Sequence, residues 1–581
     1  MNSEFTSIVE KENIKQMERK YSDIKGVKEL IDICWAKGME YVIVSPGSRN
    51  APLSISFAKD QRIKSLVIVD ERSAAYFALG ITQQTRKPVG LVCTSGTALL
   101  NYGPAIAEAY YQRLPLVVIS ADRPTEWIDQ DDSQAIPQPD VFKGFVKDSY
   151  QLPLDANNPD DCWYLNRMVN EALSKAQSGR LGPVHINFPL REPLYGVKQY
   201  PNMDERVIRK LSSVDELSAD SIEMLAEIFN STKKILILAG LLHQQPELNQ
   251  LLSELAKQSN VIVMTESVAN LHDENFLPCI DRVICSVKED EVKDFQPDLL
   301  INFGGPLVSK MIKTFLRDNR PNEHWFVGKE DHFIDTFKNL TSHVDVSPLA
   351  FFKQLLPLIT EVESGYTNFW KERNALVENI HNQYLENLQW SDMKAFQKIL
   401  KAIPEGGNLQ LANSSVVRYA QLFKTSNQLS YNSNRGTSGI DGCTSTAAGA
   451  ALVNGKITTL ITGDISFFYD SNGLWNKYLQ LNLKIILINN GGGGIFRFIS
   501  GPSGVEELEE YFETVQEYKA DKLAETYGLD YFYAENEAEV ENILPQFYAA
   551  NNKAAVLEIK TPRTINDQVL INYFKNIKTQ V

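Results

Sequence analysis

The chain has 581 residues, of which 43% are hydrophobic and 23% are charged. These fractions are typical of folded globular proteins and exclude collagen-like and intrinsically disordered classes. A single hydrophobic core stops growing near ~250–300 residues, so the length predicts about three to five domains. The 73 acidic and 58 basic residues leave a net charge of −15, which disfavours nucleic acid and anionic membranes as partners.

Membrane insertion and export are also disfavoured. No apolar run reaches the ~18 residues that a spanning helix needs, and residues 1–20 are charged throughout, unlike a signal peptide. We therefore expect a cytoplasmic protein. Its six cysteines form no CxxC pair and its seven histidines form no HExxH motif, which predicts reduced, buried thiols and, for any bound metal, oxygen ligands.

Apolar runs of strand length alternate with helix-length segments along the whole chain, which predicts parallel sheets joined by crossover helices. In the first third the expected strands are residues 41–45, 64–70, 89–94, 116–120 and 184–188, with helices within 73–83 and 97–114. Residues 189–210 contain Pro193, Gly196 and Pro201 and show no periodicity. This interruption predicts a domain boundary.

The same alternation continues to the C-terminus. We expect middle strands at residues 234–239, 260–265, 298–303 and 325–328, with helices at 248–258 and 308–316. A helical connector is expected over residues 352–390, followed by strands at 409–413, 428–433, 458–462, 484–489 and 555–560. The prediction is three sequential doubly wound α/β domains, covering residues 1–200, 201–370 and 371–581.

Two strand ends in the last third carry the strongest chemical signal. One apolar strand ends in Gly463-Asp464, and the next ends in Asn489-Asn490, so Asp464 and Asn490 lie 26 positions apart. That gap suits one strand–helix–strand unit, which brings both polar ends to the carboxyl edge of one sheet, where open α/β folds bind ligands. Carboxylate, amide and backbone oxygens suit Mg²⁺, and the glycine run at 491–494 permits close backbone approach.

Each piece alone has an ordinary explanation, because Gly-Asp can begin a helix and Asn-Asn-Gly can form a turn. The two together, each following an apolar strand, favour a metal–diphosphate site. The arrangement resembles the signature of thiamine diphosphate enzymes. Such enzymes also need a carboxylate at the cofactor's pyrimidine ring, and Glu71 lies at a strand–helix junction in the first third.

A narrower resemblance covers nearly the whole chain. It is carried by seven strings, at residues 45–53 (SPGSRNAPL), 70–72 (DER), 94–98 (TSGTA), 120–124 (SADRP), 132–136 (DSQAI), 413–418 (NSSVVR) and 433–442 (SNRGTSGIDG). In this order they resemble the 2-succinyl-5-enolpyruvyl-6-hydroxy-3-cyclohexene-1-carboxylate synthases, the MenD family of thiamine diphosphate enzymes.

The resemblance implies a fold, an activity and partners. The three domains would be a pyrimidine, a middle and a diphosphate domain. The reaction would decarboxylate 2-oxoglutarate and add the succinyl unit to isochorismate in menaquinone biosynthesis, with thiamine diphosphate and Mg²⁺, or Mn²⁺ in its place. Because the pyrimidine and diphosphate halves of these enzymes meet across a subunit interface, we expect a homodimer or a dimer of dimers.

The resemblance also implies site residues. Glu71 is the expected catalytic group, Asp464, Asn490 and the Gly492 carbonyl are the expected metal ligands, and Ile440 is expected beneath the folded cofactor. The remaining cofactor contacts are expected from Ser466, Ile495 and Phe496.

Both substrates are dicarboxylates, which call for arginine-rich sites. The positions that match the family strings are Ser48, Arg49, Arg123, Gln134, Ser414, Arg418 and Arg435, and Lys310 is expected from the family's middle domain. The family's Lys-Arg pair in the middle domain is Lys310-Met311 here, and Lys313, on the same expected helix face, is a candidate replacement.

Other functions compete with this interpretation. Another thiamine-dependent carboligase, similar to acetohydroxyacid synthase, would act on monocarboxylates and would need fewer arginines. A non-catalytic relative should have lost Glu71, Asp464 or Asn490. Several thiamine-dependent carboligases bind a flavin in the middle domain, and Ala239-Gly240-Leu-Leu here is not a GxGxxG motif. A nicotinamide dehydrogenase should have a phosphate-binding loop after a strand, and none follows the expected strands.

Overall fold

The computed structural model describes residues 19–581 except 157, 201–204, 212 and 500. Most of the charged N-terminal stretch and part of the expected boundary near residue 200 therefore lie outside the described residues. The chain forms two compact units. The first runs to Ser212 and includes Ala448–Val453 and Asn472–Tyr478, and the second contains the rest.

The first unit contains a parallel sheet with the strand order β3-β2-β4-β5-β7-β6. An antiparallel pair, β1–β8, belongs to the same unit. Its strands are β1 (Arg19–Ser22), β2 (Tyr41–Val44), β3 (Lys64–Val67), β4 (Val89–Cys93), β5 (Leu116–Asp122), β6 (Ser149–Gln151), β7 (Val184–Pro189) and β8 (Val197–Tyr200). Its helices are α2 (Lys25–Ala36), α3 (Ala51–Lys59), α4 (Glu71–Thr85), α5 (Thr97–Asn101), α6 (Gly103–Gln112) and α7 (Pro159–Ala176).

The second unit contains two such sheets, of which the first has the order β11-β10-β9-β12-β13-β14. Helices α8, α9 and α13 pack on one face of this sheet, and α10, α12 and α14 pack on the other. The strands are β9 (Ile235–Ala239), β10 (Val261–Thr265), β11 (Phe276–Leu277), β12 (Leu299–Phe303), β13 (Glu323–Val327) and β14 (Ser342–Val344). The helices are α8 (Ala219–Ser231), α9 (Pro246–Leu255), α10 (Ile280–Ile284), α11 (Val292–Phe295), α12 (Lys310–Asp318), α13 (Pro348–Leu355) and α14 (Tyr366–Glu386).

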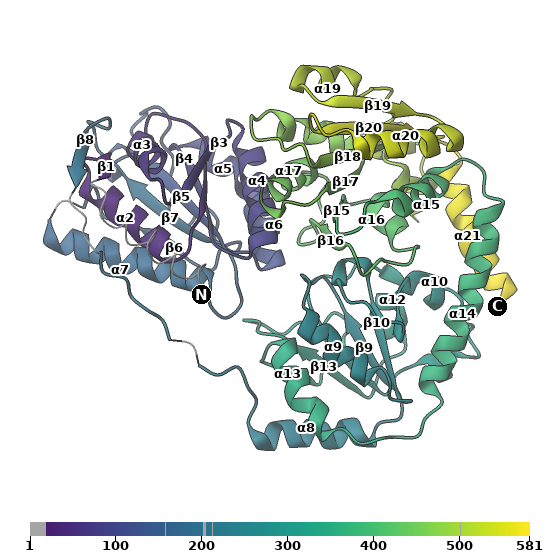
Figure 1. The fold of residues 1–581 in the computed structure, drawn as a ribbon. Helices are drawn as coiled ribbons and strands as arrows, with labels where there is room; N and C mark the ends of the chain where they lie inside the picture. The colour runs from purple at the N-terminus through teal and green to yellow at the C-terminus, as the bar shows by residue number, and fades with distance from the viewer. Residues whose placement is uncertain (1–18, 157, 201–204, 212, 500) are drawn as a thin grey trace, which may run out of the picture. The chain divides into compact units, whose positions relative to one another are not determined.

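The last sheet, green to yellow in Figure 1, has the order β16-β15-β17-β18-β20-β19. Its strands are β15 (Asn408–Leu411), β16 (Ser430–Ser433), β17 (Thr458–Gly463), β18 (Leu483–Asn489), β19 (Asp530–Ala534) and β20 (Ala555–Lys560). Its helices are α15 (Asp392–Ala402), α16 (Ser415–Ala420), α17 (Cys443–Asn454), α18 (Asp464–Tyr469), α19 (Asp521–Tyr527), α20 (Glu537–Ala549) and α21 (Asn566–Gln580).

The three parallel sheets confirm the predicted α/β architecture. Every strand expected from the sequence is present, to within a few residues at its ends. Sequence periodicity missed the edge strands β6, β11, β14 and β19, which are short or only half-buried and carry no continuous apolar run. The boundaries near residues 200 and 370 remain predictions.

Two other expectations concern the cysteines and the membrane. All six cysteines are buried free thiols, as expected from the sequence. Among the helices of the described residues, none is long and apolar enough to cross a membrane.

A buried ion pair joins α10 to the long helix α14. Arg282, on α10, is fully buried and its guanidinium donates to the carboxylate of Glu378 on α14. Burial of one charge without its partner is costly, so this contact fixes α14 against α10.

We predict that Glu378→Ala lowers the free energy of unfolding by roughly 3 kcal/mol, because it leaves the Arg282 charge uncompensated. The midpoint of thermal unfolding measures the effect. Lys424 lies 3.6 Å from Glu378 and is largely exposed, so Lys424→Ala is the control and should cost less than about 1 kcal/mol. Equal losses for the two variants would contradict the assignment.

Candidate functional site

Two adjacent strand tips of the last sheet form the centre of the site. Strands β17 and β18 are parallel neighbours with Gly463 opposite Ile488, so Asp464 and Asn490, which follow them, emerge together at the carboxyl edge. Both side chains are buried and both line one cavity of about 320 Å³. The sequence prediction that these two residues meet at one sheet edge is therefore matched by the structure.

The Asp464 carboxylate is held by four donors. Its Oδ2 accepts from the backbone N–H groups of Gly491 and Gly492, both at 2.8 Å, and from Gln516 Nε2 at 2.9 Å. Its Oδ1 accepts from Ile465 N–H at 2.7 Å. Burial raises the pKa of Asp464, and these hydrogen bonds oppose the rise. The carboxylate thus fixes the path of the glycine run after β18.

The glycine run needs glycine for steric reasons. Gly491 and Gly492 have φ values of +82° and +150°, a region that side chains disfavour. A Cβ at Gly492 would lie 2.8 Å from the Glu513 carbonyl oxygen, and the Glu513 carbonyl accepts from Gly493 N–H at 2.6 Å. The segment around Glu513 therefore packs directly on this loop.

Glu513 is itself anchored by cations. Its buried carboxylate pairs with Arg497 at 2.5 Å and with Arg563 at 3.1 Å. Gln516 N–H donates to the Gly491 carbonyl at 3.1 Å. Residues 508–516 thus form a fixed wall of the cavity, which Phe512 and Thr514 line.

Asn490 has a carboxylate neighbour that sequence patterns did not reveal. Its Nδ2 donates at 2.9 Å to Oδ2 of Asp392, the first residue of α15. Thr561 Oγ1 donates at 2.6 Å to Asp392 Oδ1. Burial raises the pKa of Asp392 to about 6. Asp392 lines the same cavity as Asp464 and Asn490.

The donor set of this cavity fits a divalent cation. Within the described residues no group of three or more His, Cys, Asp or Glu side chains is placed to hold a metal ion. A cation here would need the Asp464 carboxylate together with amide and backbone carbonyl oxygens, which is the chemistry that Mg²⁺ accepts.

Other predicted cofactor residues also line this cavity: Ile440, Ser466, Gly492, Phe496 and, from the predicted substrate set, Ser414. Ser466 Oγ donates to the Ile440 carbonyl at 2.6 Å, which ties the loop after β16 to the start of α18. Ile495 is buried beside Phe496 but does not line the cavity.

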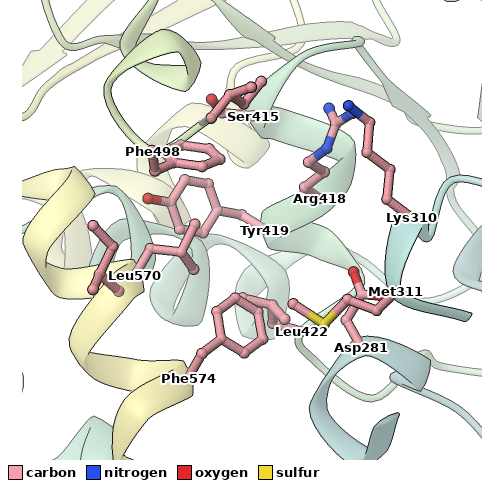
Figure 2. A pocket seen from close by; sticks show the side chains of 12 residues that line it. Asp281, Lys310, Met311, Ser415, Arg418, Tyr419, Leu422, Phe498, Leu570 and Phe574 are labelled. Carbon is pink, nitrogen blue, oxygen red and sulfur yellow. The ribbon is translucent and has the colours of Figure 1, made fainter. Parts of the chain in front are cut away.

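A second cavity, of about 330 Å³, shares Ser415 and Tyr419 with the first. Figure 2 shows the side-chain nitrogens of Lys310 and Arg418 on one side of it and the apolar side chains of Leu570 and Phe574 on the opposite side. The carboxylate of Asp281 also lines this cavity. Two cations opposite an apolar wall suit a carboxylate carried on a hydrocarbon or ring.

The backbone around the C-terminal arginines is held tightly. Arg418 Nη1 donates to the Ser414 carbonyl at 2.7 Å, and Ser414 has a φ of +68° at the start of α16. Burial lowers the pKa of Arg418. Arg435 is buried and its Nη1 donates to Asn413 Oδ1 at 2.9 Å. Asn413 lines the first cavity, so Arg435 lies next to that cavity and contacts one of its lining residues.

The middle domain contributes Lys310 and Met311 to the second cavity. The buried Glu266 accepts from the N–H groups of Val308 and Ser309 at 2.7–3.0 Å and so fixes the start of α12. Burial raises the pKa of Glu266 to about 7. Met311 is an apolar lining residue.

Lys313 does not line the second cavity. Its Nζ donates to the Leu307 carbonyl at 3.1 Å. In this arrangement the amine satisfies backbone at the start of α12, so the expected replacement for the family's arginine is not in place.

The predicted residues of the first unit follow the carboxyl ends of its strands. Ser48 and Arg49 follow β2, Glu71 follows β3, and Arg123 follows β5. Gln134 is exposed in the loop beyond, with a φ of +55°.

Glu71 begins α4, where the Asp70 side chain caps the helix by accepting from Ser73 N–H. Burial raises the pKa of Glu71, and Asp70 adds to the rise. The carboxyl accepts from Asn101 Nδ2 at 3.5 Å. A carboxyl with a raised pKa keeps its proton to higher pH, and such a group is a candidate for proton transfer to or from a ligand.

Arg49 is buried, and its guanidinium donates to the Leu190 carbonyl at 3.0 Å and to Glu192 at 3.2 Å. Burial lowers the pKa of Arg49, and the nearby charge of Arg123 lowers it further. Arg123 pairs with Asp132 at 2.8 Å. The two guanidinium groups thus lie near one another, and each is paired with a carboxylate of the protein.

Comparison with known proteins agrees with this geometry. Three thiamine pyrophosphate enzyme models match the chain: the N-terminal TPP binding domain over residues 24–142, the middle domain over 210–411 and the C-terminal TPP binding domain over 413–559.

Curated relatives match along nearly the full length. The 2-succinyl-5-enolpyruvyl-6-hydroxy-3-cyclohexene-1-carboxylate synthase of Porphyromonas gingivalis is 42% identical, covering 97% of this chain and 98% of the relative. Those of Flavobacterium psychrophilum and Flavobacterium johnsoniae are 44% and 42% identical, each covering 96% of this chain and 100% of the relative. The chain belongs to this synthase family. The resemblance inferred from the sequence and the thiamine enzyme fold are both confirmed, and the family is favoured over an acetohydroxyacid synthase-like carboligase.

The steric demand at Gly492 yields a prediction. Gly492→Ala should lower the stability of the apoprotein by roughly 1–3 kcal/mol, because the methyl group meets the Glu513 carbonyl in a strained backbone conformation. Differential scanning calorimetry measures this loss.

Gly463→Ala is the matched control, since a Cβ at Gly463 meets no atom within 4 Å and its φ is not positive. The control should change stability by less than about 0.5 kcal/mol. A Gly492→Ala protein as stable as the control would contradict the close packing.

Proposed function

We propose that the protein decarboxylates 2-oxoglutarate and adds the succinyl unit to isochorismate, giving 2-succinyl-5-enolpyruvyl-6-hydroxy-3-cyclohexene-1-carboxylate and CO₂. The observation that carries the proposal is a pair of cavities that share lining residues. One has Asp464, Asn490 and the glycine run in its lining, which supports a metal and diphosphate there. The other has Lys310 and Arg418 in its lining, which supports an anionic substrate. The full-length match to synthases of that name supports it.

Asp464, Asn490 and the Gly492 carbonyl would hold Mg²⁺ or Mn²⁺, and the cation would hold the cofactor's diphosphate. Ile440, Ser466 and Phe496, which line this cavity, would hold the rest of the cofactor, with Ile495 buried behind Phe496. When bound, thiamine diphosphate supplies the electron sink for breaking and forming the carbon–carbon bonds.

Glu71 would hold a proton at the pyrimidine ring of the cofactor. Its half-buried carboxyl has a raised pKa, so it keeps a proton to higher pH than an ordinary glutamate and can share that proton with the ring. Glu71 and Asp464 belong to different compact units. We propose that they serve one site in a homodimer or a dimer of dimers, with each site completed by two subunits.

The cations would orient the two dicarboxylates. Lys310 and Arg418 are the cationic members of the second cavity, and Arg435, Ser414, Arg49, Arg123, Ser48 and Gln134 complete the proposed substrate set. The apolar wall of Leu570 and Phe574 favours a ring and excludes water from its carboxylates.

The direct test combines the protein with thiamine diphosphate, Mg²⁺, 2-oxoglutarate and isochorismate. Mass spectrometry should detect an adduct with the mass of both substrates less CO₂, and its formation should require all four components. Efficient CO₂ release from pyruvate in preference to 2-oxoglutarate would contradict the proposal.

We predict that Glu71→Gln lowers turnover by roughly 10²–10⁴-fold, because an amide cannot hold the proton that a carboxyl holds. Mg²⁺-dependent binding of thiamine diphosphate, measured by fluorescence titration, should be largely unchanged. Glu126→Gln removes an exposed carboxylate from the same unit and should leave turnover within twofold. Near-normal turnover of Glu71→Gln would remove Glu71 from this role.

We predict that Arg418→Ala raises the KM for at least one dicarboxylate by roughly 10-fold or more, since charged hydrogen bonds contribute about 1.5–3 kcal/mol. Steady-state kinetics with each substrate varied separately measures the change. Arg317, exposed on α12 and bonded to the Thr336 carbonyl, provides the control Arg317→Ala. Unchanged KM values for both substrates in Arg418→Ala would place Arg418 outside the substrate site.

A further inference from the structure

Asn489 is the last residue of strand β18 and Asn490 follows it directly. Each asparagine is held by a buried carboxylate from another element. Asn489 Nδ2 donates to Glu558 Oε1 on β20 at 2.6 Å, and Asn490 Nδ2 donates to Asp392 Oδ2 on α15 at 2.9 Å. All four side chains are at most 9% exposed. The two pairs therefore join the end of β18 to two different elements, β20 and α15.

Only one of the two pairs faces the cofactor cavity. Asp392 and Asn490 both line the cavity with Asp464, whereas Asn489 and Glu558 do not. Glu558 is instead satisfied by groups that hold β19 and α19: Ala520 N–H at 2.8 Å and Tyr531 Oη at 2.8 Å. The Glu558 pair lies outside the cavity lining, although Asn489 Oδ1 accepts from Gly491 N–H at 3.2 Å. It is the comparison for the Asp392 pair.

The chemistry of Asp392 determines how the Asn490 amide is turned. An ionised carboxylate only accepts hydrogen bonds, so the Asn490 atom facing Asp392 must be Nδ2. In a planar carboxamide, Oδ1 then points away from Asp392. Asn490 is thereby prevented from presenting its N–H₂ group in place of its oxygen.

Asp392 is held rigidly enough for this task. Thr561 Oγ1 occupies its other oxygen at 2.6 Å, and Asn566 Oδ1 accepts from its backbone N–H at 2.8 Å. Its position in the first turn of α15 places the carboxylate at the positive end of the helix. Residues at the end of β20 and at the start of α21 thus hold Asp392 in place, and Asp392 in turn holds the Asn490 side chain.

We propose that Asp392 is a positioning residue for the metal site, which turns Asn490 Oδ1 toward the cation and adds a second buried negative charge beside Asp464. The proposal rests on the proposed metal site at Asp464 and Asn490. Groups that orient metal ligands commonly contribute roughly 10–100-fold to metal affinity.

The test is direct Mn²⁺ binding, measured by electron paramagnetic resonance of free Mn²⁺ at saturating thiamine diphosphate, which requires no turnover. Asp392→Asn keeps an oxygen for Asn490 but removes the charge, and we expect roughly 10-fold weaker binding. Asp392→Ala also frees the amide, and we expect up to about 100-fold weaker binding. Glu558→Gln is the matched control and should bind Mn²⁺ within twofold of the unmodified protein.

A double-mutant cycle separates positioning from a distant charge effect. If Asp392 acts through Asn490, then Asp392→Ala should weaken Mn²⁺ binding much less when Asn490 is already alanine. Thermal unfolding of each apoprotein verifies that the variant is folded. If Asp392→Ala does not fold, the Mn²⁺ affinity of Asp392→Asn tests the proposal alone.

The outcomes distinguish the metal site from the role of Asp392 within it. The proposed metal site itself fails if the unmodified protein does not bind Mn²⁺. It fails equally if Asp464→Asn leaves the binding unchanged. If Asp464→Asn abolishes binding but both Asp392 variants bind within twofold of the unmodified protein, only the role of Asp392 is overturned. Additive effects in the cycle would likewise overturn positioning through Asn490.

Discussion

The arrangement of the site depends on one buried carboxylate at a strand tip. Asp464 accepts from two glycine amides, from its own helix start and from Gln516. Without that carboxylate, the backbone amide of Gly492 would lose its acceptor in a buried place, and that of Gly491 would keep only the longer hydrogen bond to Asn489 Oδ1, at 3.2 Å. The same carboxylate is the negative charge that a cation would require.

Other charged side chains surround the Asp464 carboxylate. Glu513 is neutralised by Arg497 and Arg563 and closes over the glycine run, while Asp392 faces the asparagine beside it. On the substrate side the signs reverse, and Lys310 and Arg418 line the second cavity. An acidic protein can therefore still bind dicarboxylates, because cations beside a cavity act over short distances that the diffuse surface charge does not cancel.

Much of this site could be predicted from the sequence because its ligands sit on local patterns. Asp464 and Asn490 follow uninterrupted apolar strands, and parallel strands in one sheet place such tips together. Arg418 and Lys310 could be found only through resemblance to family strings, since a lone cation has no signature of its own. Ser391-Asp392 is typical of any helix start, so nothing local distinguishes Asp392 as a neighbour of Asn490, 98 positions away.

The remaining misses have the same physical origin. Gln516 and Glu513 lie in an acidic, aromatic segment that resembles a solvated loop, and only tertiary packing brings them onto the glycine run. Lys313 has the spacing of a substrate cation, but its amine satisfies the Leu307 carbonyl. Helical spacing predicts the helix face on which a residue lies. Which acceptor its charged group contacts depends on the tertiary structure around it.

The most direct measurement is the anomalous scattering of Mn²⁺ in crystals of the protein grown with thiamine diphosphate. The account predicts one strong anomalous peak within coordination distance of Asp464, the Asn490 Oδ1 and the Gly492 carbonyl, with the Asn490 Nδ2 still facing Asp392. A diphosphate bound without a metal peak at these three oxygens, or a Mn²⁺ ion held elsewhere in the chain, would contradict it.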